Sequence, residues 1–377
     1  MMNCELRQLN TFIKSCSTSN AAIKNTASPI PKEGWYPAYS ASGQDVWLPE
    51  YRYSGKGIVV SAVGARCGKC FQADGKWNVT ANTHVLLVDE SIADYKYCWY
   101  LLNNENWWIK SGSGQPFVKV KDSLNRSILL PDLSTQQNIA TILDKISEGI
   151  ALCRKMMDEL DLMVKAKFGE MFGDLSSPEC QWEKCHLIEV CANKDDIKCG
   201  PFGTQLSKEE YLSEGVAVWE IPQINSQFAK KPTHFLTRQK AEQLSAYSLL
   251  PGDIAMSRKG NVGKCAIFPS CFAPGIIHSD VLRIRVDSAK VNPIFMMSQL
   301  HYSGAVTRQI EIVSLGAIMA GINVTKLKQI IVHVPPYAIQ NRFAAFVAEI
   351  DKSKLTIQKI LDKMETEKLA LMQEYFG

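Results

Sequence analysis

A long internal repeat constrains the fold of this chain more than any other feature of its sequence. The run from Pro131 to Gly173 recurs 204 residues later, from Pro335 to Gly377, without a gap. Identical residues in the two copies include Gln136 and Gln340 near the start of each run. A repeat of this length predicts that one structural unit occurs twice in the molecule.

The first copy has the residue spacing of a coiled-coil helix. Apolar side chains follow one another at alternating steps of four and three residues over more than three heptads. They are Ile139, Leu143, Ile146, Ile150, Cys153, Met157, Leu160 and Val164. The second copy places Phe343, Val347, Ile350, Ile357, Leu361 and Met364 at the matching sites.

The second helix differs from the first at two seam positions, Lys354 and Lys368. These lysines disfavour simple self-pairing, so we expect the two helices to pair with each other. Each helix begins after a proline and ends at a glycine, and about 37 residues make a helix of roughly 55 Å. The long segment between the copies allows them to run antiparallel as a coiled coil.

The segments that precede the helices form a fainter repeat. Gly57–Ser61 leads into a turn with Gly64, Gly68 and Lys69, and Gly252–Ser257 leads into a turn with Gly260, Gly263 and Lys264. Strand patterns dominate both segments, so each is predicted to be α+β. We expect a pseudo-twofold molecule with globular domains at 1–130 and 176–334 and helices at 131–175 and 335–377.

Composition excludes several classes of protein. With 46% hydrophobic and 21% charged residues, the chain is expected to fold. It has no uncharged apolar run of membrane-spanning length and no signal-peptide pattern at Met1, so we expect a cytoplasmic protein with reduced cysteines. The net charge is +4 over residues 1–130 and +3 over residues 176–334. These small excesses are compatible with a polyanion partner and equally with an ordinary solvated surface.

Motifs that suggest catalysis or metal binding are incomplete. The glycine-lysine turns lack the spacing and the Ser or Thr of a nucleotide-binding loop. Val334 replaces the polar residue that an adenine methyltransferase places before Pro335-Pro336-Tyr337. Cys67 and Cys70 form a single CxxC without a second ligand pair. We therefore predict no catalytic residue, no metal site and no enzymatic activity in this chain.

The pattern of repeats resembles the DNA-specificity subunit of type I restriction–modification systems. Residues 130–144 are similar to the helix start "P-x-L-x-x-Q-x-x-I-A-x-I-L-D" of that family. Residues 200–206, Gly-Pro-Phe-Gly-Thr-Gln-Leu, resemble its "G-x-F-G-S-x-L" loop, and residues 252–258 resemble "G-D-I-L-x-S-R". The first globular segment lacks the Gly-x-Phe-Gly loop.

The resemblance implies that each globular segment is a target-recognition domain that reads one half of a bipartite double-stranded DNA target. The helices would set the spacer and bind two methyltransferase (modification) subunits, and restriction subunits would complete the endonuclease complex. S-adenosylmethionine, ATP and Mg would then belong to those partners, and this chain would hold no cofactor. The alternative is a coiled-coil scaffold whose globular units bind proteins or RNA.

Polar and basic side chains in the predicted loops are the candidates for DNA contact. Arginine reads guanine and Asn or Gln reads adenine, whereas lysine mostly contacts phosphate. A single polar residue of this kind is more often an ordinary solvated surface residue than a base reader. Taken together, the candidates identify the loops that are expected to contact DNA. The candidates are Gln44, Arg52, Arg66, Lys69, Asn82, Gln115, Gln205, Asn225, Arg258, Lys259, Asn261, Lys264, His278, Arg308 and Asn323.

Overall fold

A computed structural model describes residues 4–17, 27–314 and 321–377. The chain divides into two compact units, and each unit contains part of both long helices. Unit 1 consists of Met1–Arg154 and Lys359–Gly377, and unit 2 consists of Lys155–Gln358. The two units do not separate the globular segments from the helices. The predicted boundaries of the four segments, at 130, 175 and 334, therefore stay a prediction.

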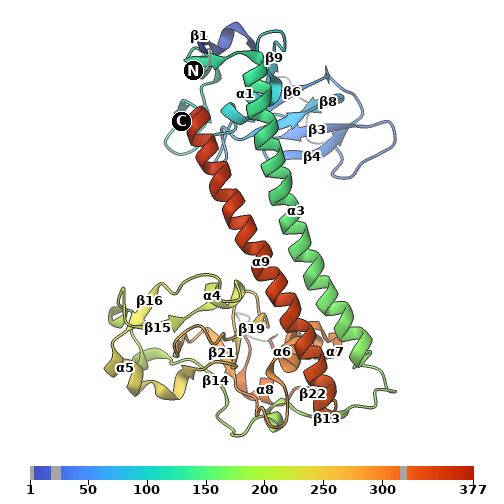
Figure 1. Cartoon of the computed structure of the whole chain (residues 1–377), viewed down its shortest axis with the longest axis vertical. Helices are drawn as coiled ribbons and strands as arrows, with labels where there is room; N and C mark the ends of the chain where they lie inside the picture. The colour runs from blue at the N-terminus through green and yellow to red at the C-terminus, as the bar shows by residue number, and fades with distance from the viewer. Residues whose placement is uncertain (1–3, 18–26, 315–320) are drawn as a thin grey trace. The chain divides into compact units, whose positions relative to one another are not determined.

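Unit 1 is built on two four-stranded sheets (Figure 1). The first sheet has the strand order β2-β9-β6-β7 and the second has the order β4-β3-β8-β5. Only β3 and β8 pair in parallel within these sheets. The strands are β2 (Ile13–Ser17), β3 (Tyr36–Ser40), β4 (Gly43–Leu48), β5 (Tyr53–Ser54), β6 (Gly57–Ser61), β7 (Cys70–Ala73), β8 (Lys76–Val79) and β9 (Thr83–Val88).

Unit 2 repeats this topology strand for strand. Its sheets have the orders β14-β21-β18-β19 and β16-β15-β20-β17, and β15 pairs with β20 in parallel. The strands are β14 (Ile197–Cys199), β15 (Val216–Trp219), β16 (His234–Leu236), β17 (Ser248–Leu249), β18 (Ile254–Ser257), β19 (Cys265–Ile267), β20 (Gly275–Ile277) and β21 (Val281–Ile284). The predicted α+β class and the internal repeat are therefore confirmed.

The central strands β6 and β18 read as continuous apolar runs because both of their faces are buried. Ile58 and Val60 belong to one apolar cluster of unit 1, whereas Val59 between them belongs to another. Ile254 and Ala255 are divided in the same way between two clusters of unit 2. Successive side chains of a strand point to opposite faces, so such a strand has no polar face.

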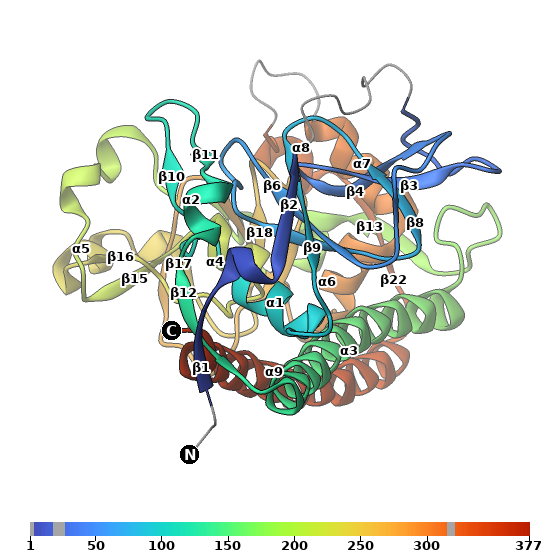
Figure 2. The ribbon, with the colours of Figure 1, turned by 90° about the horizontal axis from the view of Figure 1, so that it is seen from above.

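A two-stranded ribbon leads into each long helix. In unit 1, β1 (Cys4–Gln8) pairs antiparallel with β12 (Ser127–Pro131), and the two lie side by side in Figure 2. In unit 2, β13 (Glu183–His186) pairs with β22 (Ile331–Val334). Each ribbon ends at a proline, whose missing N–H suits the entry to a helix.

The remaining helices are short and belong to one unit each. Unit 1 contains α1 (Tyr95–Leu102), α2 (Val120–Leu124) and the hairpin strands β10 (Lys110–Ser111) and β11 (Phe117–Val118). Unit 2 contains α4 (Ile221–Asn225), α5 (Arg238–Gln243), α6 (Pro293–Tyr302), α7 (Gly304–Ser314) and α8 (Val324–Lys328). None of the helices in the part of the chain that the structure describes is both long enough and apolar enough to span a bilayer.

The long helices α3 (Leu133–Phe172) and α9 (Tyr337–Phe376) bury the seam that the heptad spacing predicts. Gly173 follows α3 with φ of 71°, the left-handed conformation that commonly ends a helix. Fully buried seam residues are Ile139, Leu143, Ile150, Cys153, Val164, Phe343, Val347, Ile350, Ile357 and Leu361, and Ile146, Met157, Leu160 and Met364 are partly buried.

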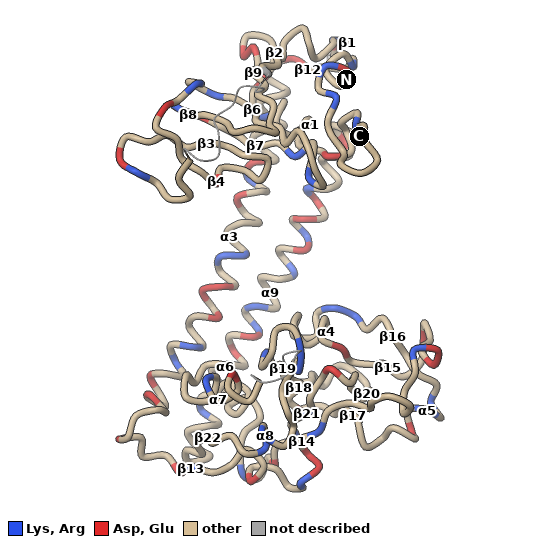
Figure 3. The backbone as a smooth tube through the Cα atoms, turned by 180° about the vertical axis from the view of Figure 1, so that it is seen from behind, with Lys and Arg blue, Asp and Glu red and all other residues tan. Residues whose placement is uncertain are grey.

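Pairs of side chains across the seam show that the helices run antiparallel in each unit. In unit 1, Arg154 contacts Glu365 at 2.6 Å and the Lys368 ammonium donates to the Ser147 hydroxyl at 2.7 Å. In unit 2, Lys354 forms an ion pair with Asp161. The second pair of unit 2 is Phe168 and Phe343, with 5.6 Å between ring centres. Acidic and basic residues are interspersed along both helices (Figure 3). Both seam lysines thus have specific partners on the other helix.

Candidate nucleic-acid interface

The turn between β6 and β7 is held in shape by main-chain hydrogen bonds. The Ser61 amide donates to the Lys69 carbonyl at 2.8 Å, and the Gly68 amide donates to the Ser61 carbonyl at 2.8 Å. The Lys69 amide donates to the Arg66 carbonyl at 3.1 Å. Gly64 and Gly68 have φ of 99° and 93°, which side chains with a Cβ rarely adopt.

The turn between β18 and β19 has the same bonds at matching positions. The Ser257 amide donates to the Lys264 carbonyl at 2.8 Å, and the Gly263 amide to the Ser257 carbonyl at 3.1 Å. The Lys264 amide donates to the Asn261 carbonyl at 3.2 Å. The hydrogen bonds therefore make Lys264 the equivalent of Lys69 and Asn261 the equivalent of Arg66. The turn of unit 2 is one residue shorter, so the two turns share three main-chain hydrogen bonds but differ in length and in their side chains.

Two further loops of unit 1 lie beside its turn. The Ala62 amide donates to the Asn82 carbonyl and the Gly64 amide donates to the Pro116 carbonyl, both at 2.9 Å. The structure thereby brings together the loops that carry Arg66, Lys69, Asn82 and Gln115. Arg66, Asn82 and Gln115 are exposed, and the Lys69 ammonium lies 5.9 Å from the ring centre of Phe71.

Gln44 and Arg52 lie on the second sheet of unit 1. Gln44 is exposed in β4, and a Cβ added to its neighbour Gly43 would meet the Phe71 ring at 3.3 Å. Gln44 is therefore next to the turn. Arg52 lies near the start of β8, where its amide donates to the Trp77 carbonyl at 3.1 Å, so it does not belong to the same loop group.

Several candidates of unit 2 are held by other side chains. The Arg258 guanidinium donates to the Ile322 carbonyl at 3.1 Å and lies 4.9 Å from the ring centre of Phe202. Lys259 forms an ion pair with Asp280 at 2.9 Å. The same carboxylate lies 3.7 Å from Nδ1 of His278. Asp280 thus reduces the positive charge that this group of residues can offer to a phosphate.

The remaining six candidates of unit 2 differ in whether their side chains are already bonded. Asn225 accepts a hydrogen bond from the Ser257 hydroxyl at 3.2 Å, and Gln205 accepts one from the Tyr247 hydroxyl at 3.0 Å. Asn323 caps α8 by accepting from the Lys326 amide at 3.1 Å. Arg308 is exposed on α7. Asn261 and Lys264 carry no side-chain hydrogen bond or ion pair in the described structure.

A pocket of about 410 Å³ adjoins the turn of unit 2. Asn261 and Lys264 line it together with His301 of α6 and Thr307 and Glu311 of α7. Burial lowers the pKa of His301, and the nearby Lys264 lowers it further. Within the described residues no group of three or more His, Cys, Asp or Glu side chains could hold a metal ion.

The CxxC thiols of unit 1 are packed against its interior. Cys67 and Cys70 are buried, and the Cys70 thiol donates to the Leu102 carbonyl at 3.2 Å. Burial raises the pKa of Cys70 far above its ordinary value, and that of Cys265, its counterpart in unit 2, to about 12. Thiols with raised pKa values are poor nucleophiles and poor metal ligands.

A second surface of unit 1 contains the predicted candidate Arg52 together with Tyr51 and Lys76, which sequence reasoning did not identify. Exposed Tyr51 packs its ring on Tyr36, with 4.9 Å between ring centres, and the Lys76 ammonium lies 4.9 Å from the Tyr51 ring centre. Arg52 lies 5.9 Å from the ring centre of Tyr53. The run Tyr51-Arg52-Tyr53, with an arginine between two tyrosines, is the sequence signal that could have identified this surface. Aromatic rings beside cations are suited to contact with nucleic acid.

Comparison with protein families gives a match over most of the chain. Residues 11–162 and residues 181–366 each match the family described as "Type I restriction modification DNA specificity domain". The chain belongs to this family. The two matched segments agree with the two units that carry the repeated sheets.

Curated members of the family are distant in sequence. The chain is 24% identical over 332 residues to the "Type I restriction enzyme MjaVIII specificity subunit" of Methanocaldococcus jannaschii. The match covers 82% of this chain and 75% of that protein. It is 25% identical over 143 residues to the "Putative type I restriction enzyme MjaX specificity subunit" of the same organism, covering 36% of this chain and 33% of that protein.

Solved structures of the family share the fold. The S subunit of the type I restriction–modification system of M. genitalium matches 100% of this chain and 96% of its own, with a TM-score of 0.66 and 15% identity. A second similar chain comes from a structure that describes complex assembly and conformational transition of the type I R-M system. The match covers 99% of this chain and 98% of that chain, with a TM-score of 0.53 and 14% identity.

Proposed function

We propose that this family member reads a bipartite DNA sequence, with one half-site for each unit. The observation that supports this proposal best is the pair of matching turns. The turns share three main-chain hydrogen bonds, and in that pattern Arg66 occupies the position in unit 1 that Asn261 occupies in unit 2. Arginine forms paired hydrogen bonds with guanine and asparagine with adenine, so the two units would prefer different bases.

The basic residues of the turns would hold the DNA backbone. Lys69 and Lys264 occupy equivalent positions beside the candidate base readers. Lysine contacts to phosphate release counterions, which gives affinity without sequence preference and makes binding sensitive to salt. The small net charges of the two globular segments imply that the chain alone binds DNA weakly, and partner subunits would supply the remaining contacts.

Methyltransferase subunits would bind the outer faces of the long helices. Apolar side chains remain exposed there outside the seam, including Leu152 of unit 1 and Leu162 and Met163 of unit 2. Exposed apolar side chains that recur along a helix are typical of a partner-binding face. The methyltransferase and restriction subunits would contribute S-adenosylmethionine, ATP and Mg, and this chain would have no catalytic role.

Co-expression with the neighbouring methyltransferase gene tests the proposal. Host DNA is sequenced for N6-methyladenine, with and without this chain. Methylation confined to one bipartite motif, and lost when the chain is deleted, is the expected result. Methylation that is unaffected by the deletion, with no co-purification of the two proteins, would contradict it and favour the scaffold alternative.

A further inference from the structure

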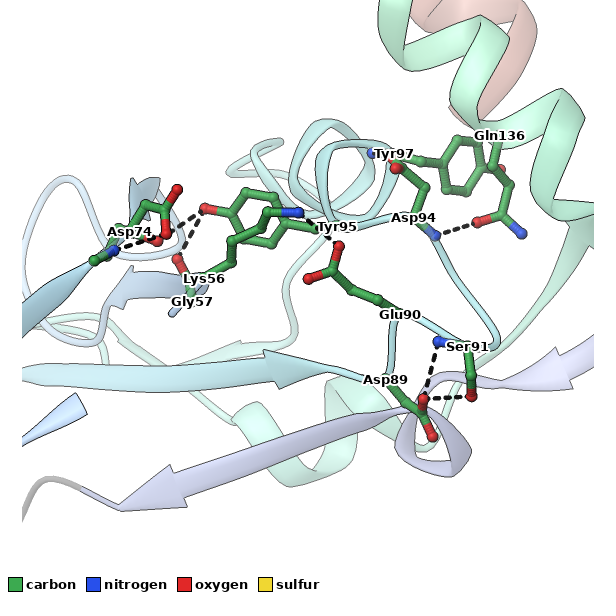
Figure 4. A network of polar contacts seen from close by, with 12 residues as sticks. Lys56, Gly57, Asp74, Asp89, Glu90, Ser91, Asp94, Tyr95, Tyr97 and Gln136 are labelled. Atoms are coloured by element: carbon green, nitrogen blue, oxygen red, sulfur yellow. Dashed lines mark hydrogen bonds and ion pairs between the residues drawn. The ribbon is translucent and has the colours of Figure 1, made fainter. Parts of the chain in front are cut away.

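Gln136 of α3 is a fully buried polar side chain that joins two elements of unit 1. Its Oε1 atom accepts a hydrogen bond from the amide of Asp94 at 2.8 Å (Figure 4). Its Nε2 atom donates to the carbonyl of Pro131 at 2.8 Å. The side chain has 0% exposure, so no solvent competes for these groups. We call this pair of bonds a glutamine bridge.

Unit 2 contains a second glutamine bridge at the matching position of α9. The Oε1 atom of Gln340 accepts from the amide of Asn292 at 2.8 Å, and its Nε2 atom donates to the carbonyl of Pro335 at 2.7 Å. Gln340 also has 0% exposure. The recurrence of the same four atoms and two bonds in both units shows that the bridge belongs to the repeated architecture.

Each bridge completes the cap of a short helix from outside that helix. Asp94 is the N-cap of α1 and Asn292 is the N-cap of α6. In a capping box, the third residue of the helix bonds to the N-cap amide through a Glu or Gln side chain. That position holds Tyr97 in α1 and Phe295 in α6, and neither side chain can accept this bond. The glutamine of the long helix accepts it instead.

The capped helices connect the bridges to the sheets with the candidate DNA-contacting turns. In unit 1 the hydroxyl of Tyr95, the first residue of α1, donates to the Gly57 carbonyl of β6 at 3.0 Å (Figure 4). α1 also packs against β7, and α6 packs against β19. The turns β6–β7 and β18–β19 are therefore linked to a long helix through one short helix and one glutamine.

We propose that Gln136 and Gln340 are positioning residues that fix the orientation of each recognition turn on its long helix and so restrict the DNA spacer length. The proposal rests on the proposed function, because a spacer exists only if both units read DNA. Without the glutamine, the buried amide of Asp94 or Asn292 has no hydrogen-bond acceptor, which is energetically costly. A small rotation of α1 or α6 would expose that amide to water and restore a hydrogen bond. The rotation would carry the recognition turn with it.

The experiment uses the full chain co-expressed with its methyltransferase, and it compares Gln136→Met and Gln340→Met with the native chain. Methionine has a similar volume and cannot form either bond. Methylation is measured on DNA duplexes with the native spacer and with spacers one base pair longer and shorter. We expect discrimination between native and altered spacers to fall about tenfold in each variant, with the half-site bases unchanged.

Two further variants keep the test decisive. Gln136→Glu retains the acceptor for Asp94 and loses the donor to Pro131, so its discrimination should lie between those of the native chain and Gln136→Met. Gln137→Met changes the exposed neighbour and should behave as the native chain. Hydrogen exchange at the Asp94 amide should be faster only in Gln136→Met, and exchange at the Asn292 amide should be faster only in Gln340→Met.

Different failures identify different errors. Variants that lose thermal stability but keep strict spacer discrimination would overturn the positioning role and leave a purely structural one. If the native complex does not methylate a bipartite motif, the proposed function and the positioning role are both wrong. If Gln136→Met does not fold, Gln136→Glu and Gln340→Met decide the outcome by the same spacer measurement.

Discussion

At the scale of single residues, the proposed function assigns base reading and phosphate binding to different side chains of each turn. Arg66 is exposed, with a guanidinium that no described side chain engages, whereas Lys69 lies along the Phe71 ring. An arginine that reads a base contributes about 1–3 kcal/mol at one position of the target. A lysine on phosphate contributes equally to all sequences.

Arg66→Ala and Lys69→Ala should therefore weaken binding in different ways. We expect Arg66→Ala to lose preference at one base pair by roughly 5–150-fold, because the paired hydrogen bonds to that base disappear. Lys69→Ala should lower affinity for all duplexes and reduce the salt slope by about one. Fluorescence anisotropy of the purified complex on single-base duplex variants at two salt concentrations measures both effects, and Lys121→Ala on α2 is the control. Identical specificity profiles for the two turn variants would contradict this assignment.

His333 shows how burial at one residue makes stability depend on pH. Its side chain is 4% exposed, and neither ring nitrogen has a hydrogen-bond partner in the described structure. Burial lowers the pKa of His333 below the ordinary value, with a smaller contribution from Lys184. Below about pH 6.5, His333 binds a proton in the unfolded chain but stays neutral in the folded chain. The free energy of unfolding therefore decreases as the pH is lowered.

His333→Leu should remove this pH dependence. Leucine cannot bind a proton, and an apolar side chain suits a site that is only 4% exposed. Relative to the variant, the native chain should lose at most about 1.4 kcal/mol of unfolding free energy per pH unit below pH 6.5. Melting temperatures of both proteins at pH 7.5, 6.5 and 5.5 measure the difference. Parallel curves would show that the His333 ring is solvated.

At the scale of the helices, the seam lysines specify which helix pairs with which. Lys354 is 12% exposed in its side chain and is paired with Asp161, which lies on α3 of the same unit. A largely buried ammonium contributes little net stability when it is paired, and removal of its partner destabilises the protein. The pair therefore favours one register and orientation of the two helices over others.

Lys354→Met combined with Lys368→Met should keep or raise the melting temperature and weaken pairing specificity. The apolar side chains continue the seam, so self-association becomes more favourable. Asp161→Ala should instead lower stability by about 1 kcal/mol, because Lys354 loses its partner. Light scattering and thermal melts distinguish the two, with exposed Lys352→Met as the control. A strictly monomeric double variant would show that shape alone determines the pairing.

At the scale of the whole molecule, the proposed function makes the length of the helices a determinant of the DNA target. Inserting one heptad between Arg154 and Lys155, and another between Gln358 and Lys359, preserves the seam period. Seven residues lengthen a helix by about 10 Å, close to three base pairs of DNA. Sequencing of N6-methyladenine should then show the same half-sites with a spacer about three base pairs longer.

Four-residue insertions at the same two places are the control for this prediction. They change the angular phase of the seam by breaking the heptad period, and they should abolish methylation. An unchanged spacer after the heptad insertions would show that the helices do not set the distance between half-sites.

The repeated architecture could be predicted from the sequence because the heptad spacing of apolar residues and the 204-residue offset between the copies each extend over many residues. The seam from Ile139 to Val164 and the matching strands around Ser61 and Ser257 were all visible as patterns. Contacts that depend on a single side chain were not. Asp280 neutralising Lys259, and Gln136 bonding to the Asp94 amide, join residues 21 and 42 positions apart that no local pattern connects.

The candidate site was predictable as a set of loops and less so as a set of free side chains. Arg66 and Asn261 are exposed at equivalent positions, in agreement with the role expected from their residue types. Arg258 and Gln205 have the same residue types but are already bonded, to the Ile322 carbonyl and to Tyr247. Only three-dimensional contacts reveal which polar groups remain available.

The recognition turns have a consequence for how this chain can change over evolutionary time. Their shape depends on main-chain hydrogen bonds and on glycines, and the side chains at Arg66 and Asn261 contribute nothing to it. Substitutions at these positions therefore have little effect on folding, so they can accumulate without a stabilising change elsewhere. Under the proposed function, a host lineage could acquire a new target sequence through single substitutions, one half-site at a time.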